Sequence, residues 1–159
     1  MRVYTDASSR SKISGLGYIA TDKHHNKIQE GSTVIEQNDN NTAELQAIIY
    51  AIDETQPLLQ KNESVILFTD STYAIGAIRN NIYRSEEEPL VKKIQNLMEY
   101  AEYKIFWIKG HCQDGTVLSH YNKKVDKLAK RVRVEYEKER IKEKRKKNLV
   151  KKGKEFSYE

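Results

Sequence analysis

The alternation of apolar and polar positions in the first third of the chain predicts three short strands. Segments 1–6, 15–21 and 27–35 are rich in β-prone residues, and polar turns separate them. Gly31, within the third segment, would suit a β-bulge. Because the connections are short, we expect these strands to form an antiparallel meander.

A change to helical spacing follows. In TAELQAIIYAIDET the aliphatic residues recur three or four positions apart, which predicts a helix that Asn40, Asn41 or Thr42 could cap. Residues 64–69 (SVILFT) then form an apolar run that fits a strand buried on both faces. Further along, two helices are expected at 71–81 and 86–103, and a fifth strand at 104–109.

The last helix is predicted to begin near Tyr121 and to run past Arg145. Its apolar stripe is almost lost beyond Tyr136, which indicates a docked first half and a solvated second half. The order of elements predicts an α/β fold, with a mixed sheet flanked by helices and a basic C-terminal helical extension.

Charge is unevenly distributed along the chain. The net charge is +5, yet residues 1–122 hold 12 basic and 16 acidic groups, whereas residues 123–154 hold 16 basic and 5 acidic groups. Such asymmetry favours a polyanionic partner, usually a nucleic acid. The alternative is a solvated helix of interspersed lysine and glutamate.

Composition bears on the compartment as well. The single cysteine, Cys112, excludes an internal disulfide and suits a reducing environment. The start, MRVYTDASS, does not read as a signal peptide, and no apolar run approaches the roughly 20 residues that span a bilayer. We therefore expect a cytoplasmic, monomeric protein of one domain with no membrane partner.

Two carboxylates are predicted to lie at strand ends. Asp6 follows RVYT and Asp70 follows VILFT, and sites in α/β sheets gather beyond the carboxyl ends of strands. If the two strands are parallel neighbours, these carboxylates lie side by side, and a divalent cation would remove their repulsion. Taken alone, each would more often be a strand-end turn or a helix cap.

Two more acids, Glu44 and Asp126, are predicted to lie on helices beside apolar residues. An acid so close to an apolar stripe needs a partner or a metal. For Glu44 the alternative is a first-turn acid that stabilises the helix dipole. For Asp126 it is an i,i+4 ion pair with Lys130.

Five motifs together resemble the type 1 ribonuclease H family. They are YTDAS, TAEL, FTDSTYAIGAI, IKGH and YNKKVDKLA, and they follow the family's order across residues 4–129. The resemblance implies a five-stranded mixed sheet, with three antiparallel and two parallel strands and helices on both faces. Together with the loss of the apolar stripe beyond Tyr136, this predicts a catalytic domain over residues 1–136, followed by a basic extension over 137–159 that is partly helical or disordered.

The resemblance assigns catalytic roles residue by residue. Asp6, Glu44, Asp70 and Asp126 match the carboxylates that bind the metals. His111, in IKGH, matches a loop histidine that helps product or metal release, although it could equally be a surface histidine.

Contacts with the substrate are implied in the same way. Asn40 and Asn41 match positions that touch the hybrid in the minor groove, with a polar helix lead-in as the alternative. Ser71 is expected to touch the DNA strand, and Asn122 to be structural or to cap the last helix.

A member of this family would hydrolyse the RNA strand of RNA/DNA hybrids. Two Mg²⁺ or Mn²⁺ ions about 4 Å apart would clamp the scissile phosphate and leave 5′-phosphate and 3′-hydroxyl ends. Cleavage should be largely sequence-independent, because 2′-hydroxyls and sugar shape are read rather than bases. The alternatives are a non-catalytic module that binds hybrid or double-stranded RNA, a nuclease or integrase acting on DNA, and a reverse transcriptase domain.

The chain departs from the family's pattern at four places. The glycine loop after Asp6 is altered and lacks the proline that many relatives carry. The basic protrusion is absent, and we predict that residues 138–154 replace its grip on the hybrid, unless they bind another nucleic acid or an acidic protein. Asp39 stands where relatives often have a threonine in a phosphate pocket, and an acid repels phosphate. The loop before the last helix is long, which makes His120 a rival for the role of His111.

Overall fold

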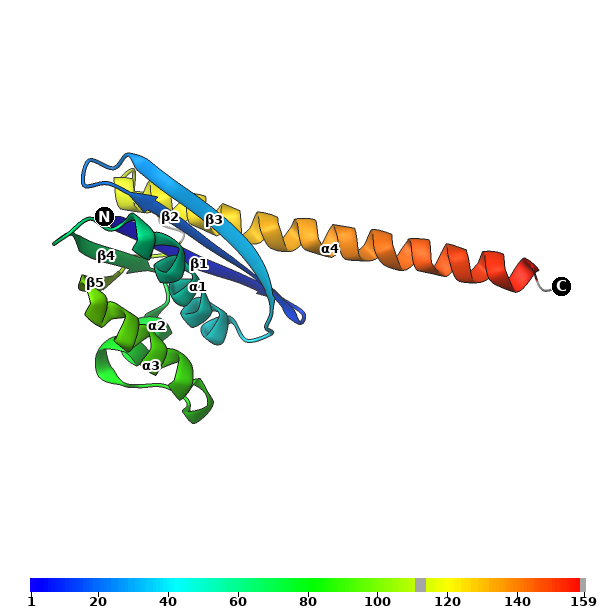
Figure 1. Ribbon diagram of the computed structural model, residues 1–159, viewed down its shortest axis with the longest axis horizontal. Coiled ribbons are helices and arrows are strands. Elements are labelled where there is room, and N and C mark those ends of the chain that lie inside the picture. Colours follow the sequence, from blue (N-terminus) through cyan, green and yellow to red (C-terminus); the bar gives the residue numbers. More distant parts are fainter. Residues whose placement is uncertain (111–113, 158–159) are drawn as a thin grey trace.

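The computed structural model describes residues 1–110 and 114–157, which form one mixed sheet with helices on both faces (Figure 1). The strands, β1 to β5 in chain order, are Arg2–Arg10, Ile13–Thr21, Lys27–Glu36, Ser64–Thr69 and Glu102–Trp107. Their spatial order is β3-β2-β1-β4-β5. The β1–β2 and β2–β3 pairs are antiparallel, whereas β1–β4 and β4–β5 are parallel, so the predicted fold class is confirmed.

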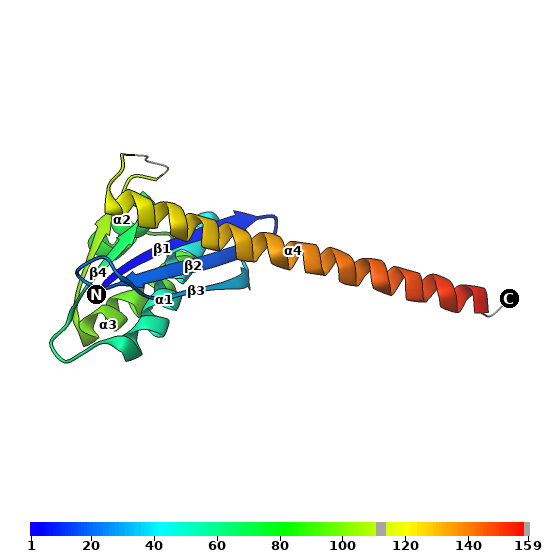
Figure 2. The same ribbon diagram turned by 90° about the horizontal axis from the view of Figure 1, so that it is seen from above.

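Helices cover the two faces of the sheet unequally. The described helices are α1 (Asn40–Thr55), α2 (Thr72–Asn80), α3 (Glu88–Leu97) and α4 (Val117–Ser157), with short 3₁₀ turns at 56–58, 85–87 and 98–100. The first three helices lie on one face, and α4 crosses the other (Figures 1 and 2).

Some predicted boundaries were wrong. β1 runs to Arg10 rather than ending at Asp6, because its hairpin with β2 keeps it paired as far as Arg10 and Ile13. Gly31 forms no bulge, since it pairs with Tyr18 in regular register. The helix expected over 86–103 gives way to a 3₁₀ turn after Leu97, and α4 begins earlier than Tyr121.

The larger core lies between the sheet and helices α1 to α3. α1 contributes Leu45, Ile48 and Ile52, none of which has exposed surface. Each buried side chain of this kind contributes about 1.5–3 kcal/mol. Their spacing of three and four residues forms one stripe, and this stripe holds Glu44, one residue before it, against the sheet.

Two glycines of β2 let α4 lie close to the opposite face. A Cβ atom on Gly15 would lie 2.0 Å from the Ala129 carbonyl oxygen, and one on Gly17 would lie 3.2 Å from the Ala129 nitrogen. The apolar stripe of α4 can therefore reach a small aromatic core, in which Val125 packs with Tyr4. This close packing fixes α4 along β1 and β2.

Beyond the sheet, α4 continues as one unbroken helix (Figure 2). Arg133 Nε donates to Ser8 Oγ at 3.1 Å near the end of the docked part. Every residue from Lys138 to Lys154 is exposed. The boundary between a domain over 1–136 and an extension over 137–159 stays a prediction. None of the described helices has an apolar stretch long enough to cross a bilayer.

Gly15→Ala should destabilise the protein by at least about 2 kcal/mol, because the new methyl group would overlap a backbone carbonyl of α4. Gly76, in α2, provides a matched control, since a Cβ atom there would have no neighbour within 4 Å. Gly76→Ala should instead stabilise by about 0.5–1 kcal/mol, through better helix propensity. Urea unfolding followed by circular dichroism measures both changes. Equal stability of the two variants would contradict the close approach of α4.

Candidate active site

Asp6 lies just past the point where β1 loses one of its two neighbours. β1 pairs with β4 only as far as Tyr4, whereas its pairing with β2 continues to Arg10. β4 ends at Thr69, so Asp70 follows directly beyond the parallel pairing. The two strands are parallel neighbours, which meets the condition that the sequence analysis set for bringing Asp6 and Asp70 together, and both carboxylates therefore lie at the same end of this strand pair.

Glu44 joins these two acids from α1. One carboxylate oxygen from each of Asp6, Glu44 and Asp70 lies within 4.8 Å of the others. The Ala7 N–H donates to Glu44 Oε1 at 3.3 Å. Glu44 Oε2 is buried and has no hydrogen-bond partner among the described residues. A buried oxygen without a donor is costly unless a cation satisfies it.

The environment of the cluster disfavours carboxylate charge. Burial raises the pKa of Asp6 well above its usual range, and the nearby carboxylates raise it further. Burial also raises the pKa of Glu44 to about 8, although hydrogen bonds with Asp6 and the Ala7 N–H act in the opposite direction. A divalent cation would reverse this balance, and three carboxylates are a donor set that fits Mg²⁺ or Mn²⁺.

Asp126 approaches the cluster from α4, but it also has a partner on its own helix. Its carboxylate lies close enough to Asp6 to contribute to the raised pKa of Asp6. Its Oδ2 lies 3.1 Å from Lys130 Nζ, and the side chain is 24% exposed. The alternative i,i+4 pair is thus present. The group of acids within 4.8 Å does not include Asp126, and its role as the fourth ligand stays a prediction.

The end of β5 and the residues that follow it lie against Asp70. Trp107 Nε1 donates to the Asp70 carbonyl oxygen at 3.1 Å. A Cβ atom on Gly110 would lie 3.0 Å from Asp70 Oδ2, so the glycine of the IKGH motif leaves room for this carboxylate. His111, the next residue of the motif, lies outside the described residues, and its role stays a prediction.

The predicted substrate contacts lie at the starts of two helices. Asn40 and Asn41 are exposed in the first turn of α1, one turn before Glu44. Ser71 caps α2 by accepting a hydrogen bond from the Ala74 N–H at 3.0 Å. Capping was the open alternative for Asn40 and Asn41, but Asp39 caps α1. For Ser71 the sequence predicted only a contact with the DNA strand, and its capping role was not anticipated. The substrate contacts of all three residues stay predictions.

Because α4 begins at Val117, earlier than predicted, Asn122 and His120 both lie within the helix. Asn122 lies in the second turn and is 5% exposed, so it is structural and does not cap the helix. His120 is exposed and packs edge-on against Tyr121, with ring centroids 5.3 Å apart. It lies six residues, or about 9 Å along the helix, before Asp126. The choice between His120 and His111 for the role in product or metal release stays a prediction.

A network at the start of α1 was not predicted from the sequence. Asp39, rather than one of the three residues after it, caps the helix by accepting from the Thr42 N–H at 2.9 Å. Arg84 donates two hydrogen bonds to Asp39, at 2.9 and 3.0 Å, and these lower the pKa of Asp39 to about 2. Glu87, only 1% exposed, accepts from Thr42 and Arg84. Two carboxylates therefore occupy the guanidinium, and the network anchors the turn that precedes Glu44.

Residues 1–133 match the model of the RNase H family. The chain belongs to this family. A ribonuclease H of Clostridium botulinum (strain Hall) is 28% identical over 146 residues, which cover 80% of this chain and 91% of that protein. The assignment to the type 1 ribonucleases H is thereby confirmed.

Solved ribonuclease H structures share the fold. LC11-RNase H1, isolated from compost by a metagenomic approach, gives a TM-score of 0.72 at 21% identity and covers 85% of this chain and 96% of that chain. The same enzyme in complex with an RNA/DNA hybrid gives 0.73 at 20% identity, with 85% and 97% covered. The N-terminal RNase H domain of rv2228c from Mycobacterium tuberculosis gives 0.69 at 19% identity, with 87% and 97% covered.

In this ribonuclease H family member, the metal-free protein should lose stability as the pH rises from about 5 to 8. Folded Glu44 keeps its proton up to a pKa of about 8, whereas the unfolded residue loses it near the ordinary value of 4.5. Between these two pKa values the folded state binds more protons than the unfolded state, so the free energy of unfolding falls as the pH rises. Above a pH of about 8 it no longer changes with the titration of Glu44. Thermal unfolding in EDTA across this range measures the effect.

The matched pair Glu44→Gln and Glu54→Gln isolates the buried carboxylate, since Glu54 is an exposed acid on the same helix. Glu44→Gln should raise the melting temperature at pH 8 more than at pH 5, by about 2–4 °C for each 1 kcal/mol of penalty removed. Added Mg²⁺ should stabilise the unmutated protein more at pH 8 than at pH 6, because its ligands must lose protons. Identical pH profiles for both variants would rule out a strained carboxylate cluster.

Proposed function

We propose that this protein is a metal-dependent endoribonuclease that hydrolyses the RNA strand of RNA/DNA hybrids. The observation that carries the proposal is the buried cluster of Asp6, Glu44 and Asp70, with one oxygen of each within 4.8 Å of the others. Membership of the family over residues 1–133 supports the same activity. Further support comes from LC11-RNase H1, a structural neighbour that binds such a hybrid.

Asp6, Glu44 and Asp70, with Asp126 as a fourth ligand, would hold two Mg²⁺ or Mn²⁺ ions. The buried Glu44 Oε2, which lacks a donor among the described residues, supports a cation at this place. When bound, the ions supply Lewis-acid activation of a water molecule and stabilise charge on the leaving oxygen.

The reaction is a hydrolysis in which one P–O bond replaces another. The oxygen of water bonds to the scissile phosphorus, the P–O3′ bond breaks, and the departing 3′ oxygen takes up a proton. The products are therefore a 5′-phosphate and a 3′-hydroxyl.

The chain's own contribution is to hold its acids in fixed positions. Asp6 lies within a sheet strand and Glu44 on a packed helix, and both side chains are at most 4% exposed. Carboxylates on such rigid elements need little rearrangement when substrate arrives. We also propose that Asn40, Asn41 and Ser71 contact the hybrid beside this cluster. The catalytic domain would comprise residues 1–136.

Asp70→Asn should lower hybrid cleavage by more than about 100-fold, since even residues that only support metal ligands cost about 10–100-fold when changed. Asp53→Asn, an exposed acid on α1, is the matched control and should leave the rate unchanged. The assay incubates labelled RNA/DNA hybrid, duplex DNA and duplex RNA with Mg²⁺, Mn²⁺ or EDTA. Mass spectrometry then identifies the product ends.

Two results would contradict the proposal at different points. If hybrid is bound but never cut in the presence of metal, the protein is a binding module rather than an enzyme. If Asp70→Asn cuts as fast as the unmutated protein, the activity lies elsewhere than in this cluster.

A further inference from the structure

α4 carries a second set of charges that the catalytic proposal does not use. Seven of its exposed cations lie along one side of the helix, although other exposed cations lie elsewhere around it. The seven are Lys124, Lys127, Arg131, Lys138, Lys142, Arg145 and Lys152. Successive members are three, four or seven residues apart, so they share one side of a helix with 3.6 residues per turn. This set is called the α4 basic stripe below.

The stripe does not overlap the acid cluster. Asp126 lies one residue before Lys127 and two after Lys124, which places it about 100° and about 160° around the helix from them. Arg133, on the same side as Asp126, contacts Ser8 of β1. α4 therefore turns one flank toward β1 and the acids, and the stripe lies on the other flank.

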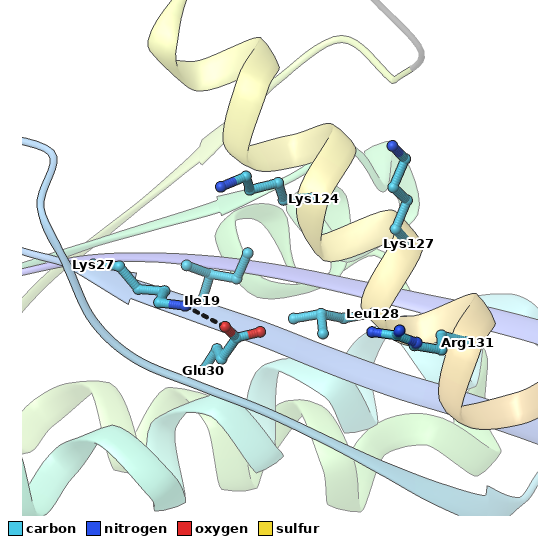
Figure 3. Close-up of a pocket in the computed structure, with 7 residues that line it drawn as sticks. All are labelled: Ile19, Lys27, Glu30, Lys124, Lys127, Leu128 and Arg131. Carbon is cyan, nitrogen blue, oxygen red and sulfur yellow. Dashed lines mark hydrogen bonds and ion pairs between the residues drawn. The ribbon is translucent and has the colours of Figure 1, made fainter. Parts of the chain in front are cut away.

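A pocket of about 480 Å³ marks the start of the stripe, between α4 and β3 (Figure 3). Ile19 and Leu128 contribute its apolar lining, and the first three members of the stripe line its α4 side. Lys27 and Glu30, from β3, form an ion pair with each other across from them. The pocket therefore keeps the net positive charge of the three α4 cations.

Most of the stripe is not neutralised by the protein. Among residues 1–110 and 114–157, the stripe members with no carboxylate at ion-pair distance include Lys127, Lys138, Arg145 and Lys152. Arg131 and Lys142 do pair, with Glu135 at 3.5 Å and Glu139 at 3.4 Å. Exposed pairs of this kind contribute only about 0–1 kcal/mol, so a phosphate can replace them.

We propose that the α4 basic stripe binds the phosphate backbone of nucleic acid at a site separate from the acids. From Lys124 to Lys152 the stripe covers about 42 Å of helix, which corresponds to about 12 phosphates of one strand at 3.4 Å each. Lysine and arginine in a row on an exposed flank contact charge rather than base edges. The proposal rests on the proposed function only for the identity of the polymer, since binding does not require cleavage.

The exposed part of α4 does not suit a membrane surface or a second helix. Ile141, Leu149 and Val150 are 51%, 69% and 58% exposed. At about 100° per residue they are spread over about half of the helix circumference. Helices that lie on membranes or form coiled coils need one continuous apolar face, which these residues do not make.

This placement changes the interpretation of the extension. If residues 138–154 replaced the missing protrusion, they would bind the hybrid as part of the catalytic surface. The α4 basic stripe instead begins on the docked half of α4 and lies on the flank away from Asp126. A second contact of this kind raises the local concentration of substrate without changing the chemical step. Loss of the stripe should therefore raise KM for a long hybrid and leave kcat unchanged.

The test uses the full chain carrying Asp70→Asn, so that hybrid is bound without being cut. The stripe variant carries K138Q, K142Q, R145Q and K152Q. The matched control carries R140Q, K144Q, K147Q and K151Q, which removes the same residue types from the opposite flank of the same exposed segment. Fluorescence anisotropy gives Kd for a hybrid and a duplex DNA of roughly 24 base pairs, twice the length of the stripe, at several salt concentrations.

The stripe variant should bind both duplexes at least about tenfold more weakly, with a salt slope smaller by about 3.6 for four lost phosphate contacts. The control should lose less than about threefold. Equal losses in the two variants would mean that only net charge matters, and no loss in either would mean that α4 is not a contact. A loss confined to the hybrid would assign the residues to the catalytic surface. Each of these three results overturns the proposal.

A further variant tests whether the stripe begins at the pocket. K124Q, K127Q and R131Q together should weaken binding to both duplexes in the same way, since these residues line the pocket of Figure 3. Unchanged binding would show that the stripe members on the docked half of α4 do not contact nucleic acid, which contradicts a stripe that begins at the pocket. Melting temperature and circular dichroism confirm that each variant is folded and that α4 remains helical.

Discussion

Repulsion between buried carboxylates at the β1–β4 edge is the constraint that the rest of this structure must satisfy. Two unit charges at about 4 Å repel by about 4 kcal/mol at the effective dielectric of a protein site, and a domain is stable by only about 5–15 kcal/mol. Asp6, Glu44 and Asp70 are nevertheless held together. Protons can relieve the repulsion in the absence of metal, as the raised pKa values of Asp6 and Glu44 indicate.

The elements that hold the acids are rigid for separate reasons. On one face, the apolar stripe of α1 anchors Glu44, and the network of Asp39, Arg84 and Glu87 fixes the helix start. On the other face, two glycines of β2 bring α4 into direct contact with the sheet. Because both helices are held by packing and hydrogen bonds remote from the carboxylates, the cluster can persist despite its internal repulsion.

Sequence reasoning was most accurate where the chemistry follows local periodicity. Two β-prone segments that each end on an aspartate were enough to state the condition that would bring Asp6 and Asp70 together, namely parallel pairing of β1 with β4, and the structure meets that condition. The full length of β1 could not be predicted. Its residues beyond Asp6 are in a strand because they pair with β2 in a hairpin, and they have no alternating apolar pattern of their own. The earlier start of α4 had a readable signal, since Thr116 Oγ1 accepts from the Ser119 N–H at 3.2 Å as a capping residue does.

Long-range polar pairs were beyond the reach of one sequence. Asp39 and Arg84 are 45 residues apart, and neither lies in a periodic pattern that would link them. Glu87 is one of three consecutive glutamates at the start of the helix expected over 86–103, a position where acids commonly stabilise the helix dipole. The structure nevertheless buries it almost completely. The neighbouring Glu86 and Glu88 are exposed, so composition alone could not distinguish the one glutamate with a network role.

One period of 3.6 residues accounts for the two flanks of α4. The residues that face the sheet are apolar only as far as the sheet extends, which explains why the stripe of Val125 and Ala129 fades beyond Tyr136. The charged positions do not depend on the sheet, and they continue with the same spacing onto the exposed segment. Lysine, arginine and glutamate are strong helix formers, so the segment can extend the docked helix without a core of its own. Since the helix is unbroken, the basic stripe keeps a fixed orientation relative to Asp126. Phosphates bound along it would be held on a line about 80–160° around the helix from that residue.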